Sequence, residues 1–191
     1  MKIETFEDFY QKLLADAFDA ENQLIKALPK MAKAASSDEL RSAIEEHLEQ
    51  TREHASRIEK IFESSDQSPK RTKCKAMEGL IEEGEEVIKE FEEGELKDAA
   101  LICAAQKVEH YEIATYGSLR TFASMLGETE AQSLLEETLN EEKEADQKLN
   151  EIAESINPEA LEEEEGEEEP QPATKQNKTA KPGTRNKQRV A

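Results

Sequence analysis

Six side chains of types that bind metal ions fall at positions that a helical fold would bring together. They are Glu21, His54, Glu109, Glu112, Glu142 and Asp146. Carboxylates from facing helices, together with histidine, are the donors of dinuclear iron and manganese sites. Two divalent ions carry four positive charges, which four carboxylates balance. We therefore expect a site for two Fe ions, with Mn as the alternative metal; the sequence does not identify catalytic residues.

Glu112 is the candidate whose position most needs a neutralising charge. It lies in the segment QKVEHYEIATYGSL (residues 106–119), on the side of the expected helix that is otherwise apolar. A carboxylate that faces the core of a helical bundle is costly unless something neutralises its charge. A bound cation would do so.

The elements that position these residues are amphipathic helices. Apolar side chains recur at steps of three, four or seven in five segments, which predicts helices over residues 5–35, 38–63, 74–93, 95–126 and 128–156. Thr5 with Asp8 makes a capping-box-like start for the first helix, and Gly127 is a natural stop for the fourth. Pro29 need not end the first helix.

The chain contains a weak internal repeat. When it is shifted by 91 positions, residues 16–62 align with residues 107–153 without a gap, and Glu21 falls on Glu112. Two helical hairpins joined by a long connector predict a four-helix bundle, with residues 74–93 as a crossover helix between the second and third bundle helices. This connectivity is ferritin-like, so the expected fold class is an all-α ferritin-like four-helix bundle.

Counting residues from the two turns places the candidate residues at one height. Glu21 and Glu112 each lie about 15 residues before a turn, and Glu142 lies about 15 after the second turn. His54 and Asp146 lie roughly one helical turn further on.

Several positions remain open. Bundles of this type place Glu-x-x-His on two helices, whereas this chain has Thr51-x-x-His54 and Glu142-x-x-Ala145. Asp146 is a candidate substitute for the second histidine. His47 and His110 lie near the same level, either as hydrogen-bonding neighbours of the ligands or as surface residues. Glutamate is also abundant in this chain, so single inner carboxylates arise by chance.

Composition divides the chain into residues 1–157, a helical bundle, and residues 158–191, a tail that we expect to be disordered. Residues 159–169 hold eight glutamates and residues 171–191 hold six Lys or Arg. The net charge of −20 argues against nucleic acid as a partner of the bundle, while the basic end of the tail allows a weak contact with an acidic partner. No apolar run has the length of a membrane span or signal peptide, which favours a cytoplasmic location.

The chain also resembles a known family, the YciE/YciF-type ferritin-like stress proteins of bacteria. The resemblance covers residues 3–156 and rests on the segments DAENQLIKALPKMAKAA, EEHLEQT, CKAMEGLIEEGEE, QKVEHYEIATYGSL and EEKEADQKL. It implies a ferritin-like bundle, a homodimer and a dimetal site related to that of rubrerythrins. It implies no established reaction.

Two hypotheses follow. The first is a stress-associated protein whose dinuclear Fe or Mn carboxylate site handles iron or peroxide by redox chemistry, as a ferroxidase-like or peroxide-removing enzyme would. The second is a non-catalytic helical stress or interaction protein whose metal site is degenerate.

Overall fold

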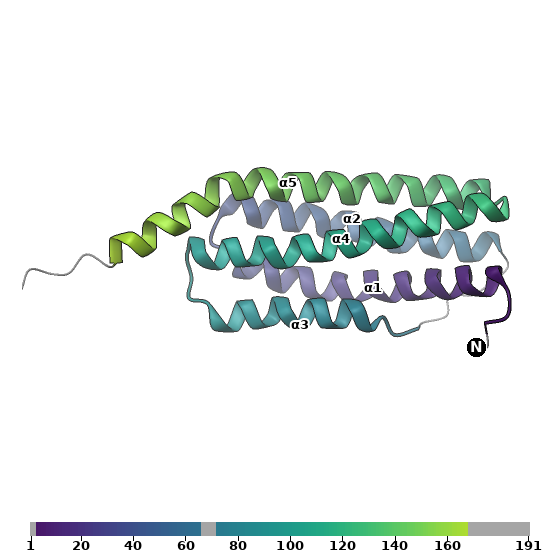
Figure 1. The fold of residues 1–191 in the computed structure, drawn as a ribbon, viewed down its shortest axis with the longest axis horizontal. Coiled ribbons are helices and arrows are strands. Elements are labelled where there is room, and N and C mark those ends of the chain that lie inside the picture. Colours follow the sequence, from purple (N-terminus) through teal and green to yellow (C-terminus); the bar gives the residue numbers. More distant parts are fainter. Residues whose placement is uncertain (1–2, 66–71, 168–191) are drawn as a thin grey trace, which may run out of the picture.

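The computed structural model describes residues 3–65 and 72–167, and all of their regular secondary structure is helical. The helices are α1 (Phe6–Ala34), α2 (Asp38–Ser64), α3 (Lys75–Glu90), α4 (Glu95–Leu126) and α5 (Thr129–Glu167) (Figure 1). The all-α prediction is confirmed. No helix in the described ranges combines the length and apolar character needed to cross a membrane.

The helix ends follow from local sequence. The side chain of Thr5 accepts a hydrogen bond from the Asp8 amide, and Asp8 bonds back to the amide of Thr5, which is a complete capping box. Ser37 caps α2 by one hydrogen bond, which its side chain accepts from the Leu40 amide. Gly127 ends α4 in the left-handed conformation, with φ of 79°. Pro29 lies inside α1 without ending it.

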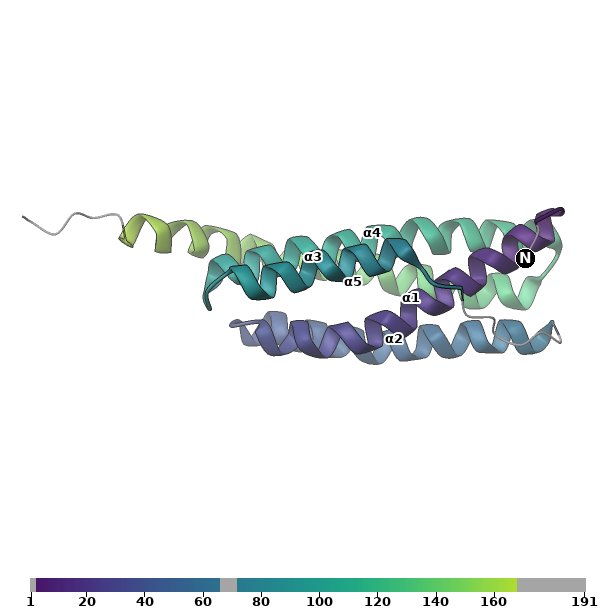
Figure 2. The same ribbon diagram turned by 90° about the horizontal axis from the view of Figure 1, so that it is seen from below.

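Helices α1, α2, α4 and α5 form the bundle, and α3 lies outside it. α1 and α2 form one antiparallel hairpin, and α4 and α5 form the other (Figure 1). α3 packs against α1 and α4 on the outside of the bundle (Figure 2). Because α3 runs back along the bundle, α2 and α4 run in the same direction. This is the crossover connectivity expected from the repeat.

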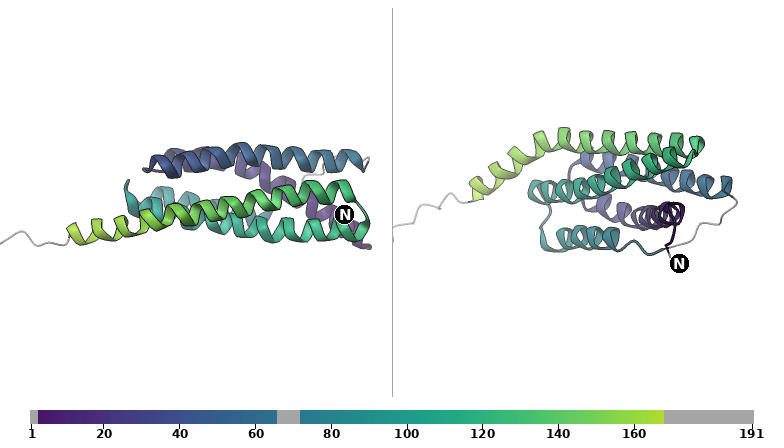
Figure 3. Two further views of the ribbon diagram at one scale, coloured as in Figure 1. Left: turned by 90° about the horizontal axis from the view of Figure 1, so that it is seen from above. Right: turned by 45° about the vertical axis from the view of Figure 1, so that its right-hand side comes forward.

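The last helix is longer than the sequence analysis predicts. Disorder was expected from Pro158, but α5 continues through Pro158 to Glu167, and Ala160 is still buried. Its last turns extend beyond the end of the bundle (Figure 3). Proline removes one backbone donor without forbidding continuation of a helix. The remainder of the expected tail, residues 168–191, lies outside the described residues.

The core consists of two apolar clusters, one toward each end of the bundle. One includes Leu24, Ile44, Leu101, Val108 and Ile152. The other includes Leu14, Ile58, Phe62, Leu119 and Leu135. Along each of the four bundle helices, the sequence passes from one cluster to the other. The residues at that passage form the candidate site.

Candidate metal centre

A layer of buried polar residues separates the two apolar clusters. Its ionisable members are Glu21 on α1, His47 and His54 on α2, Glu109 and Glu112 on α4, and Glu142 on α5; none of them is more than 7% exposed. Burying several charges at the centre of a bundle costs several kcal/mol per ion unless they are neutralised. The layer therefore needs protons or cations to be stable.

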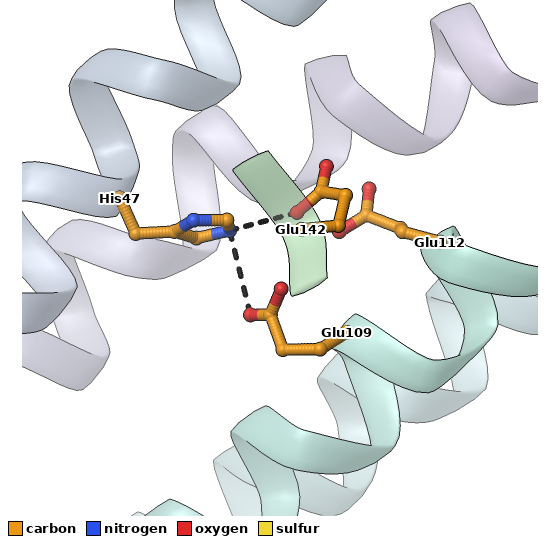
Figure 4. A group of neighbouring side chains, drawn as sticks. All are labelled: His47, Glu109, Glu112 and Glu142. Carbon is orange, nitrogen blue, oxygen red and sulfur yellow. Dashed lines mark ion pairs between the residues drawn. The ribbon is translucent and has the colours of Figure 1, made fainter. Parts of the chain in front are cut away.

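The first group of potential ligands contains His47, Glu109, Glu112 and Glu142, and each offers a ligand atom within 4.8 Å of the others. The three carboxylates point toward the imidazole of His47 from α4 and α5 (Figure 4). His47 Nε2 lies 3.4 Å from Glu109 Oε1 and 3.9 Å from Glu142 Oε2. One imidazole and three carboxylates can surround one ion.

The second group contains Glu21, His54 and Glu142, again with ligand atoms within 4.8 Å of one another. His54 Nδ1 lies 3.0 Å from Glu142 Oε1 and 3.9 Å from Glu21 Oε2. Three protein donors leave room for further ligands from solvent or substrate.

Glu142 is the residue that the two groups share. Its Oε1 is turned toward His54 and its Oε2 toward His47. Each oxygen thus faces a different group. With this orientation, Glu142 would be able to contribute one oxygen to an ion in each group.

These six residues leave nine buried polar atoms without a hydrogen-bond partner in the described part of the chain. The nine include both oxygens of Glu112 and of Glu142, and both ring nitrogens of His47. Unpaired buried polar groups are rare in folded proteins and need an explanation. Donor atoms about 2.1 Å from one ion in octahedral geometry lie about 3 Å apart, close to the 3.0 Å between His54 Nδ1 and Glu142 Oε1, which lack hydrogen-bond geometry. The residues therefore fit divalent metal ions.

The electrostatics agree with this interpretation. Burial raises the pKa of Glu21 to about 7, although nearby His54 and the hydrogen bond from Tyr116 lower it. Burial also raises the pKa of Glu112 and of Glu142 well above the ordinary value, and the neighbouring carboxylates raise both further. Without a cation, burial favours the protonated forms of these carboxyl groups; binding of metal would release their protons.

His54 is held in place by Glu141 of the opposite hairpin, which is itself bound by Arg57 of α2. Its Nε2 lies 2.8 Å from Glu141 Oε2, and Glu141 in turn accepts hydrogen bonds from Arg57. Burial alone would raise the pKa of Glu141, but the hydrogen bonds from Arg57 and His54 outweigh it, so the pKa lies below its ordinary value. An ionised Glu141 can only accept a hydrogen bond, so His54 Nε2–H donates to it and the lone pair of Nδ1 faces the site. Such partners of metal-binding histidines fix the ring and raise its basicity.

Tyr116 performs a related role for Glu21. Its hydroxyl is buried and donates a hydrogen bond to Glu21 Oε1. Burial, and then the carboxylates of Glu21 and Glu112, raise the pKa of Tyr116 well above its ordinary value, so the phenol keeps its proton. Glu21 Oε2 remains unpaired and faces His54.

The structure brings five of the six expected residues together: Glu21, His54, Glu109, Glu112 and Glu142. It does not bring Asp146 to them, because Asp146 lies in neither group and instead lies 3.3 Å from the exposed His110. Asp146 directly follows Ala145, and this step of one residue turns its side chain away from the inner face of α5. Asp146 thus points to the flank of α5.

His47 was not expected among the ligands, and no role was expected for Glu141 or Arg57. A signal for His47 was present, because His47, Thr51 and His54 follow the spacing i, i+4, i+7 that keeps side chains on one helix face. Glu141 and Arg57 act across the bundle, and no pattern within one helix indicates their contact. The Thr51 hydroxyl donates a hydrogen bond to the backbone carbonyl of His47. Because a threonine stands here in place of the expected glutamate, α2 contributes no carboxylate to the layer.

The chain belongs to the family described as "Domain of unknown function (DUF892)", which it matches over residues 5–162. It is 53% identical over 154 residues to Protein YciF of Escherichia coli (strain K12), covering 80% of this chain and 93% of that protein. The resemblance to the YciE/YciF-type family is thus confirmed.

Solved structures agree with the fold. The crystal structure of the E. coli stress protein YciF superimposes with a TM-score of 0.79 at 51% identity, covering 82% of this chain and 99% of that chain. YcfI from Rhodopseudomonas palustris superimposes with a TM-score of 0.76 at 41% identity, covering 78% of this chain and 95% of that chain.

Proposed function

We propose that this protein holds a dinuclear Fe centre, with Mn as the alternative metal, and uses it for redox handling of iron or peroxide. The observation that carries the proposal is Glu142, whose two oxygens face His47 and His54 in two adjacent groups of donors. Four carboxylates in the layer balance two divalent ions. Imidazole together with carboxylate suits Fe and Mn.

The two positions differ in their donors. His47, Glu109 and Glu112 would hold one ion, Glu21 and His54 the other, and Glu142 would bridge them. Bound in this way, the two ions would supply redox chemistry toward dioxygen or a peroxide.

The surrounding residues control protons and orientation. Glu141 holds the proton of His54 on Nε2, so Nδ1 faces the site. Tyr116 keeps its proton and holds Glu21 Oε1, which directs Oε2 inward. The apolar clusters pack on both sides of the layer.

The wider setting is also part of the proposal. The E. coli relative is described as a stress protein, and we propose a role in bacterial stress responses, in the cytoplasm, for this chain. We further propose a homodimer. An apolar surface at one end of the bundle supports it: Phe6 and Phe9 pack on Phe122 yet each remains 41% exposed.

Metal analysis of the purified full chain tests the site. After expression with added iron or manganese, we expect about two ions per chain, and fewer than one in Glu142→Gln. The matched control is Glu154→Gln, an exposed glutamate on the same helix, which keeps both ions. A wild-type protein with less than about one ion per two chains, unchanged by Glu142→Gln, would overturn the proposal.

A second candidate, a non-catalytic stress or interaction protein, is favoured by one observation: α2 places no carboxylate in the layer, which departs from the Glu-x-x-His pattern. It predicts that metal and chelator leave the melting temperature unchanged. It also predicts that Glu21→Leu and Glu112→Leu stabilise the protein under all conditions, since apolar packing replaces a buried charge.

A further inference from the structure

A cavity of about 140 Å³ opens between α2 and α5 and reaches His47 and Glu109. Its inner walls are apolar and come from all four bundle helices, through Leu28, Met31, Ala43, Ile44, Ala105 and Leu149. A water molecule needs roughly 10–15 Å³ of such volume, and an apolar cavity of about 150 Å³ holds a molecule the size of benzene. The space is therefore large enough for a small organic molecule.

The cavity exists partly because of Ala145. This residue stands where the Glu-x-x-His pattern of related metal-binding bundles has a histidine, and it lines the cavity together with His47. A histidine there would fill this space and provide a further ligand. The alanine instead leaves open space beside the group of His47, Glu109, Glu112 and Glu142.

The charges at the two ends of the cavity restrict what can enter. At the surface, Glu46, Glu144 and Lys148 surround the opening, and Lys148 is already paired with Glu46. Glu109 lies at the inner end. Acidic groups at both ends disfavour anions, and the apolar walls favour an aliphatic body.

One wall can adjust to an occupant. Leu28, Met31 and Ala105 also line a second pocket of about 30 Å³, under α3. The methyl group of Met31 lies 3.3 Å from the point that a Cβ on Gly84 would occupy, so the missing side chain of Gly84 provides its space. Methionine is unbranched and fills irregular gaps in several conformations.

We propose that this cavity binds a small neutral molecule with a short aliphatic body and an oxygen-bearing head group, of the class of alkyl hydroperoxides and their alcohols, with the head against His47 and Glu109. This inference rests on the proposed function only where it treats the bound molecule as a substrate of the metal centre. Binding itself needs the cavity and not the metal. The substrate class is thereby an organic peroxide rather than hydrogen peroxide alone.

The test uses 1-butanol as an unreactive probe with the full chain after chelation, followed by saturation-transfer NMR. We expect saturable binding of 1-butanol and at least tenfold weaker binding of butyrate, which has the same length but is anionic. Ala145→Leu fills the cavity and should weaken 1-butanol binding at least tenfold. Ala153→Leu, at a half-buried alanine on the same helix outside the cavity lining, should not.

Ala43→Leu fills the cavity from α2 and serves as an independent variant if Ala145→Leu unfolds the chain. Absence of binding to the wild type, or equal binding by both cavity-filling variants and Ala153→Leu, overturns the proposal. Addition of Mn²⁺ then tests orientation: the CH₂O protons of bound 1-butanol should broaden more than its methyl protons, and the reverse order overturns the assignment of the head group. If Mn²⁺ does not bind, the proposed function fails while the chelated experiment still decides the cavity.

Discussion

The two hairpins of the bundle have the same architecture but contribute different chemistry. α1 and α2 supply one carboxylate and two imidazoles, from Glu21, His47 and His54; α4 and α5 supply three carboxylates, from Glu109, Glu112 and Glu142. At the offset of 91 positions, Thr51 corresponds to Glu142 and His54 to Ala145. Only the pair Glu21 and Glu112 is common to both halves. A repeated scaffold therefore does not require a symmetric site.

The surroundings of the site repeat this asymmetry. The position that corresponds to Glu109 is Phe18, an apolar residue of the first hairpin that packs on Phe62 in one of the two apolar clusters. In return, His54 of the first hairpin takes its hydrogen-bond acceptor, Glu141, from the second. Each half supplies what the other lacks, so neither hairpin alone holds a complete group of donors.

The largest expected effect of substituting a donor residue is on the free energy of unfolding that is gained when metal binds. An ion at a free concentration a thousand times its dissociation constant stabilises the folded state by about 4 kcal/mol per site. We expect Mn²⁺ to give the wild type both increments, Glu21→Gln to lose about one, and Glu142→Gln to lose nearly both because Glu142 belongs to both groups. Urea unfolding with and without Mn²⁺ measures these gains.

Glu154→Gln, on the exposed side of α5, provides the baseline and should retain the full gain. Equal losses in Glu21→Gln and Glu142→Gln would show that the ions do not bind independently. Retention of both increments by Glu142→Gln would show that Glu142 does not bridge.

The next effect is the pH dependence of the chelated protein. The pKa of Glu21 is raised to about 7 in the folded state, so the folded chain binds more protons than the unfolded chain between pH about 4.5 and 7. Stability from this group is therefore present below pH about 4.5 and is lost as pH rises through about 7, on the order of 3 kcal/mol. Glu112 and Glu142 act in the same direction.

Glu21→Gln isolates this contribution. The difference in unfolding free energy between the variant and the wild type should change in favour of the variant as pH rises from 5 to 8, measured in the presence of chelator. A difference that is constant with pH would mean that Glu21 is ionised in the folded chain even without metal.

A smaller effect concerns the contact that one hairpin makes with the histidine of the other. Glu141→Gln weakens the acceptor for His54 Nε2, and we expect metal affinity to fall about tenfold, the lower end of the range for such partners. Glu137 also binds Arg57 but is 57% exposed, so Glu137→Gln should leave affinity within about twofold. Competition with a chromophoric chelator measures both. Equal affinities for the two variants would remove Glu141 from the account of the site.

The sequence predicted the fold well because helical periodicity is a local property. Each of the first four helices begins and ends within a few residues of the expected bounds, at signals such as Thr5 and Gly127. The end of α5 was the exception. Pro158 and the glutamates after it suggested disorder, yet packing of Ile156 and Ala160 accompanies the continued helix, and packing depends on tertiary structure rather than on composition.

The level of each candidate side chain along the bundle could be counted from the sequence. The direction in which each side chain points around its helix was harder to assign. Counting from the turns placed Glu21, Glu112 and Glu142 at one level, as the structure has them. Asp146 shared the expected level of His54 but lies at the flank, beside His110. One residue step rotates a side chain by about 100° around the helix, so small errors in phase exclude a true neighbour such as His47 or include a false one.

The smallest effect distinguishes the turns of the two hairpins. The first turn is held from α4, where Asp98 accepts hydrogen bonds from the amides of Ser36 and Ser37 at 2.8 and 2.7 Å. The second turn depends on Gly127 with its φ of 79°, and a Cβ there would meet no atom within 4 Å. Gly127→Ala should therefore cost about 1 kcal/mol of conformational strain without a steric clash.

Gly117 is the matched control because it lies within α4, where a Cβ would also meet no atom within 4 Å. Gly117→Ala should stabilise the chain by about 0.5–1 kcal/mol, since alanine loses less backbone entropy in a helix. Both changes should be equal with and without Mn²⁺ in urea unfolding, because neither glycine belongs to the groups of donors. A cost of Gly127→Ala that depends on Mn²⁺ would show instead that the second turn controls the position of Glu142, and that the two hairpins differ in mechanics as well as in donors.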